Sequence, residues 1–230
     1  KALRQAHCTM LLNVDAGSVC RFRPAVTMSR DMLSYEPGEI ERYGLSKARL
    51  RLIALRYVQN AALRSADGAI FLTRYAAQII EQSCGPIKNK AQVPHGVGAA
   101  FQAIDPAQRS EASPKRALRC LYVSNALPYK HPWHVVEAVA RLRQRGFDLT
   151  LELVGGGEGV AQKRLDQAIA TFDPDHAFVT QHAFVAQAAL PQFLLDADLF
   201  VFASSCENMP NTLVEAMAAG LPIACSNRGP

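Results

Sequence analysis

The residues best suited to chemistry lie in one stretch, residues 204–217, where a polar loop leads into a predicted helix. Glu207 lies in the loop, and Glu215 lies about one turn inside the helix, which we expect to begin near Asn211. Backbone N–H groups at a helix start lack partners and can bind a phosphate, helped by the helix dipole. Two carboxylates would repel a phosphate, so we expect them to accept hydrogen bonds from neutral hydroxyls, one on a sugar and one on a ribose.

A second stretch of interest is the loop after the apolar run 118–123. It contains Lys130, which stands directly before a predicted helix start at Pro132. An ammonium group at this position can neutralise a diphosphate that backbone amides already hold. A loop lysine taken alone is usually only a solvated charge, but a position facing the Glu207 loop favours a role in ligand binding.

A glycine-rich run, residues 155–159, also follows a predicted strand and precedes a predicted helix. Its spacing does not fit the dinucleotide motif Gly-x-Gly-x-x-Gly, because the third glycine would be Val160. Two interpretations stay open: a flexible turn, or a place where the backbone closely approaches a ligand.

The rest of the chain alternates between predicted strands and helices, which indicates an α/β protein. The expected strands are 25–28, 69–72, 118–123, 149–154, 177–179, 199–203 and 222–225. The expected helices are 46–63 and 73–84, with Ser46 and Thr73 as N-caps, followed by 132–145, 160–171, 188–197 and 211–219. Apolar strands that alternate with helices predict a parallel sheet covered on both faces. Ligands bind beyond the carboxyl ends of such strands, so the loops after Val123, Val154, Val179 and Ala203 should line one cleft.

The charge of the chain is unevenly distributed. Residues 1–64 hold 11 Lys and Arg against 5 Asp and Glu. The predicted helix 46–64 carries five basic residues, namely Lys47, Arg49, Arg51, Arg56 and Arg64. This segment is either a merely solvated helix or a surface for an anionic membrane or a phosphorylated acceptor. We do not expect nucleic acid as a partner, because aromatic and basic residues do not interleave.

Composition excludes several other classes of protein. An apolar fraction of 49% and a charged fraction of 20% are typical of a globular protein, and no apolar run is long enough to span a bilayer. The six cysteines show no Cys-x-x-Cys spacing, and we expect buried thiols in a reducing cytoplasm. The opening at Lys1 and the close at residues 227–230 suggest a piece of a longer protein.

The chain resembles the retaining glycosyltransferases of family 4, the group 1 family, which have the GT-B fold. Seven residues separate Glu207 from Glu215, as in the Glu-x7-Glu signature of that family, and Ala-Met-Ala-Ala-Gly-Leu-Pro-Ile-Ala follows. Residues 122–130 resemble its phosphate-binding loop, and 151–155 its next strand and turn. Residues 93–101 resemble the passage between its two domains.

This resemblance implies two Rossmann-like domains, both incomplete. Residues 1–97 would form the end of the N-terminal, acceptor-side domain, 98–116 a linker, and 117–230 a donor-binding domain truncated at its C-terminus. Lys130 would contact the pyrophosphate, Glu207 the hydroxyls of the transferred sugar, and Glu215 the ribose. The implied donor-binding residues also include Asn125, Gly155, Phe184, Val185, Asn208, Met209, Pro210, Asn211 and Thr212. The resemblance implies retention of anomeric configuration, with no metal and no cofactor besides the donor.

The sequence departs from the family pattern at three places. Asn125 stands where the family usually has an arginine, and Met209-Pro210 replaces the usual Phe-Gly. Arg30-Asp31 replaces the common His-Asp of the first domain, and Arg30 is a candidate for the missing positive charge.

We therefore expect a cytoplasmic glycosyltransferase, peripheral on the inner membrane face, that transfers a hexose from a nucleoside-diphosphate sugar. The acceptor would be a glycan or a lipid-linked glycan, in polysaccharide or lipopolysaccharide synthesis. Two alternatives stay open. One is a nucleotide-sugar epimerase of the same fold, and the other is a non-catalytic nucleotide-sugar-binding module.

Overall fold

The computed structural model describes residues 5–105, 107 and 116–228 of the chain. These residues fall into two compact units. Unit 1 contains the residues up to His95 together with Cys206–Met209. Unit 2 contains Gly96–Ser205 and Pro210–Arg228. Each unit is built around its own parallel sheet.

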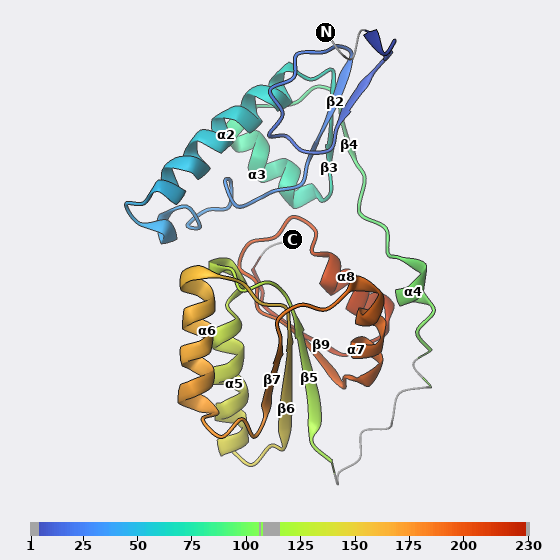
Figure 1. Cartoon of the computed structure of the whole chain (residues 1–230). Helices are drawn as coiled ribbons and strands as arrows, with labels where there is room; N and C mark the ends of the chain where they lie inside the picture. The colour runs from blue at the N-terminus through green and yellow to red at the C-terminus, as the bar shows by residue number, and fades with distance from the viewer. Residues whose placement is uncertain (1–4, 106, 108–115, 229–230) are drawn as a thin grey trace. The chain divides into compact units, whose positions relative to one another are not determined.

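Unit 1 has a four-stranded parallel sheet with the strand order β1-β2-β3-β4 (Figure 1). The strands are β1 (Leu11–Asn13), β2 (Ala25–Ser29), β3 (Gly68–Phe71) and β4 (Lys90–Gln92). The helical segments are the 3-10 turn η1 (Glu41–Tyr43), α2 (Lys47–Ser65) and α3 (Arg74–Cys84). The helix α3 buries Ala76, Ile80 and Cys84, which recur every four residues and so share one face.

Local side-chain chemistry sets the starts of α2 and α3. The hydroxyl of Ser46 accepts a hydrogen bond from the N–H of Arg49 at 3.2 Å. The hydroxyl of Thr73 accepts one from the N–H of Ala76 at 3.1 Å. Both predicted N-caps are therefore confirmed, since each hydroxyl satisfies a backbone donor that the helix itself leaves unpaired.

Unit 2 has a five-stranded parallel sheet with the order β7-β6-β5-β8-β9. The strands are β5 (Leu118–Val123), β6 (Leu149–Val154), β7 (Val179–His182), β8 (Leu199–Phe202) and β9 (Ile223–Cys225). The helices are α4 (Ala99–Gln102), α5 (Pro132–Gln144), α6 (Gly159–Phe172), α7 (Leu190–Asp196) and α8 (Asn211–Ala218). The 3-10 turns are η3 (Pro128–Lys130) and η4 (Gln187–Ala189). Figure 1 shows α5 and α6 on one face of this sheet and α7 and α8 on the other.

Each central strand of unit 2 supplies two cores, one on either face of the sheet. Cys120 and Tyr122 of β5 pack into the core beneath α5 and α6, with Val136 and Leu165. Leu121, between them, packs into the opposite core. Because alternate residues of a strand point to opposite faces, a doubly covered strand must be apolar at almost every position. The predicted α/β class is confirmed.

Several predicted boundaries differ from the observed ones. The strand expected at 177–179 begins only at Val179, because the carboxylate of Asp173 accepts the N–H groups of Ala177, Phe178 and Val179 at 2.7, 3.1 and 2.7 Å. The helix expected at 188–197 is divided into η4 and α7. Pro191 lies in the first turn of α7, where its missing N–H is tolerated.

The expected linker 98–116 is partly structured. Within it, α4 buries Phe101 in the second core of unit 2, and residues 106 and 108–115 lie outside the described residues. The expectation of buried cysteines is right for Cys84, Cys120 and Cys206 and wrong for Cys8, Cys20 and Cys225, which are exposed thiols. No helix in the described part of the chain is both long and apolar enough to cross a bilayer.

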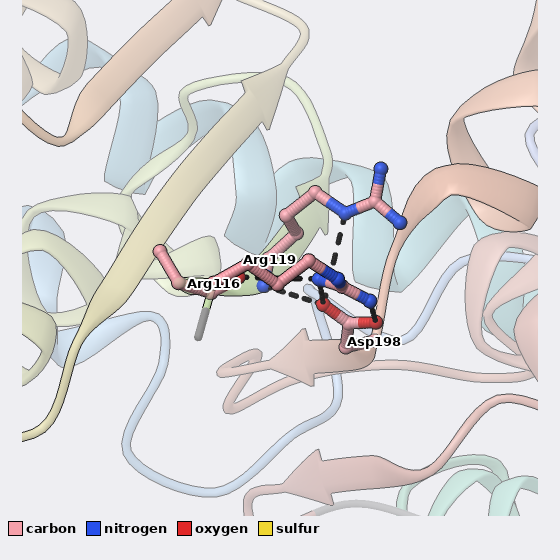
Figure 2. A network of polar contacts seen from close by, with 4 residues as sticks. Arg116, Arg119 and Asp198 are labelled. Atoms are coloured by element: carbon pink, nitrogen blue, oxygen red, sulfur yellow. Dashed lines mark hydrogen bonds and ion pairs between the residues drawn. The ribbon is translucent and has the colours of Figure 1, made fainter. Parts of the chain in front are cut away.

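A carboxylate joins the start of unit 2's central strand to the start of its neighbour (Figure 2). Asp198, just before β8, accepts two hydrogen bonds from the Arg116 guanidinium, at 2.6 and 2.7 Å. It also accepts the backbone N–H of Arg119 at 2.8 Å. These bonds, above all those from Arg116, hold the pKa of Asp198 below its ordinary value. The carboxylate thus fixes the pairing of β5 with β8.

We predict that Asp198→Ala lowers the free energy of unfolding by about 2 kcal/mol at pH 7, because hydrogen bonds to a charged group are lost. A pKa below the unfolded value means that this stabilisation is complete above roughly pH 4 and is lost as the pH falls further. Urea unfolding at pH 7 and pH 3 measures the difference.

The matched control is Asp196→Ala, which removes an exposed carboxylate two residues away. It should change stability by less than about 0.5 kcal/mol. Equal effects of the two substitutions would contradict the role assigned to Asp198.

Candidate functional site

The strand order of unit 2 creates a ligand position next to its central strand. The chain proceeds from β5 to β6 and β7 on one side, then returns to place β8 on the other side of β5. All four neighbouring strand pairs are parallel, so their carboxyl ends lie at one edge. The loops after β5 and β8 therefore depart in different directions at a reversal point, where sheets of this kind bind ligands.

The two loops at this reversal are bonded to each other. The N–H of Ser205 donates to the carbonyl of Tyr129 at 2.9 Å. The hydroxyl of Ser205 lies 2.9 Å from Nε2 of His131. The loop that carries Lys130 and the start of the loop that leads to Glu207 are thus held together within unit 2.

Lys130 has a fixed backbone. It ends the 3-10 turn η3, and its carbonyl accepts a hydrogen bond from the hydroxyl of Tyr122 at 2.5 Å. Its half-buried side chain places the ammonium 5.1 Å from the centroid of the Tyr129 ring. His131, which follows, takes a left-handed conformation with φ of 54° before Pro132 opens α5. A cation on a fixed loop is suited to bind an anion with little loss of entropy.

The start of α8 offers backbone donors. Pro210 is the N-cap residue and makes no side-chain cap, while its carbonyl accepts the N–H of Val214 at 3.2 Å. The N–H groups of Asn211, Thr212 and Leu213 come before this first intrahelical bond, so the helix itself gives them no acceptor. They point out of a helix end with a positive dipole, which suits a phosphate.

The two predicted acidic residues occupy different surroundings. Glu215 is half-buried on α8, and burial raises the pKa of its carboxyl. Hydrogen bonds from ligand hydroxyls would offset the cost of burying this charge. Glu207 is also half-buried and follows Ser205 by two residues, within the segment Cys206–Met209 that belongs to unit 1.

Two further predicted donor-binding residues, Asn208 and Met209, are bonded within unit 1. The amide of Asn208 donates to the carbonyl of Ser29 at 3.1 Å, at the end of β2. The sulfur of Met209 accepts the N–H of His95 at 3.1 Å. Arg30, the residue after Ser29, is exposed.

The glycine run is explained by packing between loops. Gly155 has φ of 112°, and a Cβ atom there would overlap the carbonyl oxygen of Ser124. A Cβ at Gly157 would lie 2.9 Å from the carbonyl oxygen of Ala126. These glycines let the loop after β6 lie against the loop after β5, so the run is more than a flexible turn.

The remaining predicted residues lie at the same edge. Asn125 is exposed, and its carbonyl accepts the N–H of Leu127 at 3.0 Å. After β7, the side chain of Phe184 is 88% exposed, while Val185 packs against the second core. An aromatic ring left in solvent at this edge is available for stacking on a base.

Sequence reasoning missed the residues that hold the loops in place. His131 and Ser205 lie 74 positions apart, so no local pattern marks their contact. Gln162 accepts the N–H of Gly157 at 2.9 Å, and Gln181 donates to the carbonyl of Gly155 at 3.3 Å. Polar residues on a helix and a strand carry no signal for such a role, although Pro132 does mark His131 as a helix boundary.

Solved structures identify the fold of the chain. Sucrose-phosphate synthase from Thermosynechococcus elongatus superimposes with a TM-score of 0.72 at 19% identity, over 90% of this chain and 51% of that one. Anabaena Alr3699/HepE, solved in complex with UDP, gives 0.66 at 22% identity, over 90% and 54%. The fold is that of the GT-B glycosyltransferases.

The sequence places the chain in a family of that class. Residues 104–230 match the family model "Glycosyl transferases group 1", and the chain belongs to that family. It is 27% identical over 186 residues to 2-deoxystreptamine glucosyltransferase of Streptomyces kanamyceticus, covering 75% of this chain and 46% of that protein. It is 27% identical over 192 residues to GDP-mannose-dependent alpha-(1-6)-phosphatidylinositol monomannoside mannosyltransferase of Mycolicibacterium smegmatis, covering 76% and 47%. The chain thus spans about half the length of these relatives.

We predict that Gly155→Ala lowers the free energy of unfolding by about 3 kcal/mol, because strain at positive φ adds to a backbone overlap. Gly146→Ala is the control. Its φ is 93°, but no atom lies within 4 Å of its Cβ position, so only strain of about 1–2 kcal/mol is expected. Chemical unfolding of both variants measures the difference, and equal losses would contradict the loop-packing role.

Proposed function

We propose that the protein is a retaining glycosyltransferase that moves a hexose from a nucleoside-diphosphate sugar to a glycan or lipid-linked acceptor. One observation carries the proposal. At the strand-order reversal of unit 2, a fixed loop carrying Lys130 lies at the same sheet edge as the uncapped start of α8. A cation together with amides that have no acceptor within their own helix suits a diphosphate.

The names of the relatives support a hexose donor. One relative is a glucosyltransferase, another is a GDP-mannose-dependent mannosyltransferase, and Anabaena Alr3699/HepE was solved with UDP-glucose. In our proposal Lys130 and the amides of Asn211 and Thr212 bind the diphosphate, and Glu215 accepts hydrogen bonds from the ribose. Glu207 binds hydroxyls of the transferred sugar. The exposed ring of Phe184, beside Val185, borders the base.

The proposed reaction exchanges one bond at the anomeric carbon for another on the same face. The bond from this carbon to the donor phosphate breaks, and a bond to the acceptor oxygen forms. The departing phosphate oxygen takes the proton of the acceptor hydroxyl. Lys130 stabilises the negative charge that develops on the diphosphate, and this proposal needs no metal ion.

We predict that Lys130→Ala lowers kcat/KM of the intact protein about 100-fold, since a preorganised charge is lost. This corresponds to a rise in the activation free energy on the order of 3 kcal/mol. Glu215→Gln should mainly raise the KM for the donor. Lys163→Ala, an exposed lysine on α6, is the control and should retain full activity. The measurement is transfer from UDP- and GDP-hexoses in the presence of EDTA.

Product analysis in the same assay tests the rest of the proposal. NMR of the product should show the anomeric configuration of the donor. An inverted product would contradict retention, and an isomerised donor without transfer would indicate an epimerase. Full activity of the Lys130→Ala variant would contradict the assignment of Lys130 to the diphosphate site.

We also propose that the first turns of α2 dock on an anionic membrane surface. Lys47 and Arg51 are exposed there, next to the exposed apolar side chains of Leu45 and Leu50. Basic and apolar side chains together suit a membrane interface. Arg56 and Arg64, which belong to the same basic helix, face a different part of the unit.

We predict that the double variant Lys47→Gln/Arg51→Gln binds anionic vesicles about 30-fold more weakly at low salt, because each basic residue contributes about 1 kcal/mol. Sedimentation with phosphatidylglycerol vesicles measures this. Arg74→Gln/Lys88→Gln removes the same charge from exposed positions outside α2 and should have little effect. Wild-type binding that does not respond to salt would contradict the proposal.

A further inference from the structure

Unit 1 contains a pocket that the proposed transfer reaction does not use. Its volume is about 660 Å³, and it lies between α2 and α3. Its polar lining comes mainly from Arg56, Tyr57, Asn60, Arg64, Gln82 and Ser83. Sites for small molecules commonly have 300–1,000 Å³ of space, so the pocket is large enough for one.

One part of the pocket lining lies toward the sheet edge opposite to the one where GT-B ligands are expected, while Tyr35 and Pro37 come from the loop after β2. The helix α2 leads into the start of β3, and α3 leads away from its end. The last turns of both helices therefore lie near the amino ends of the strands. Arg64, Gln82 and Ser83 belong to those last turns. A ligand bound beside these last turns would be separate from one at the carboxyl ends of the strands.

Arg56 lies on the inner face of α2. Residues four apart on a helix lie one above the other, and its neighbours Leu52 and Asn60 are 9% and 7% exposed. Arg56 itself is half-buried. Within the described part of the chain it forms no ion pair, and no carboxylate lines the pocket. A half-buried guanidinium that lines a pocket is well placed to bind an anion.

Arg64 adds a second positive charge with a fixed direction. Its Nε donates to the carbonyl of Cys84 at 2.5 Å and its Nη2 to the carbonyl of Ser83 at 3.5 Å, which orients the guanidinium without neutralising it and leaves Nη1 for a ligand. Among the residues that the structure describes, it too has no acidic partner. Two guanidiniums on one pocket wall match the oxygens of a phosphate, which arginine binds in bidentate fashion.

Buried hydrogen bonds hold the pocket wall in place. The hydroxyl of Tyr35 donates to Oδ1 of Asn60 at 2.9 Å. The amide of Asn60 donates to the hydroxyl of Ser83 at 3.0 Å, and so joins α2 to α3. Because the Ser83 oxygen accepts this bond, its own proton can be donated to a ligand. The pocket is therefore preorganised and offers a neutral donor beside its cations.

We propose that this pocket binds a phosphate ester, with Arg56 and Arg64 on the phosphate and the Ser83 hydroxyl as an additional donor. The volume exceeds that of a bare phosphate and leaves room for a polyol beside Gln82 and the exposed ring of Tyr57. A soluble sugar or glycerol phosphate and a phospholipid headgroup share this chemistry. The site is independent of the donor-binding site proposed for unit 2.

The test compares Arg56→Gln with Arg74→Gln in the intact protein. Both substitutions remove one positive charge from unit 1, but Arg74 is exposed and does not line the pocket. The soluble probe is sn-glycerol 3-phosphate, measured by calorimetry. The lipid probe is vesicles of phosphatidylcholine and phosphatidylglycerol, measured by sedimentation with and without sn-glycerol 3-phosphate as competitor.

We expect Arg56→Gln to weaken binding about tenfold in at least one arm, because a charge-assisted bidentate contact is lost, with Arg74→Gln close to wild type. An effect with sn-glycerol 3-phosphate identifies a soluble ester. An effect with vesicles alone, measured in the Lys47→Gln/Arg51→Gln background so that docking through the first turns of α2 does not contribute, identifies a lipid headgroup. Absence of wild-type binding in both arms, or equal effects of the two substitutions, would overturn the proposal.

A second measurement uses only the wild-type protein, so that no substitution can disturb the fold. The backbone amide NMR signals of Gln82 and Ser83 should shift when the probe that binds in the first test is added. Unchanged signals would also overturn the proposal. Because neither residue belongs to the donor site, loss of this site would leave the transferase proposal intact, and loss of transferase activity would leave this one intact.

Discussion

The arrangement of the loops at the carboxyl edge of unit 2 depends on one contact, between Ser205 and the segment from Tyr129 to His131. This contact joins the loops on either side of the strand-order reversal, with a backbone bond and a side-chain bond both at 2.9 Å. The hydroxyl of Ser204 also donates to the carbonyl of Tyr129, at 3.3 Å, and strengthens this contact. With it, the backbone that carries Lys130 and the chain that returns to α8 are constrained together, which a preorganised anion site requires.

Much of this architecture could be predicted from sequence because its causes are local or periodic. Ser46 and Thr73 satisfy helix donors three residues away, so the residue types alone indicate the helix starts. The apolar strands reveal a doubly covered parallel sheet, and such sheets bind ligands at the carboxyl edge. The approximate position of the loops that carry Lys130 and Glu207 follows from the same reasoning.

The parts that sequence could not predict depend on long-range contacts. Position 155 requires glycine because a Cβ atom there would overlap the carbonyl oxygen of Ser124, which lies in a different loop. The late start of β7 results from three backbone donors that bind Asp173. The basic residues of α2 looked alike in sequence, yet Lys47 and Arg51 are exposed while Arg56 faces inward. Helical spacing alone did not separate these roles, because both helix neighbours and the opposing α3 define the pocket.

The Arg116–Asp198 bond also bears on how halves of such enzymes can be recombined. Unit 2 begins at Gly96, although the family match begins at residue 104. A chimera joined at that match boundary would take Phe101, which fills the core beside α8, from a foreign parent. A junction after Arg116 would in addition separate this arginine from its native carboxylate. A junction between His95 and Gly96 keeps Phe101, Arg116 and Asp198 in one parent, although it divides the bond between His95 and Met209.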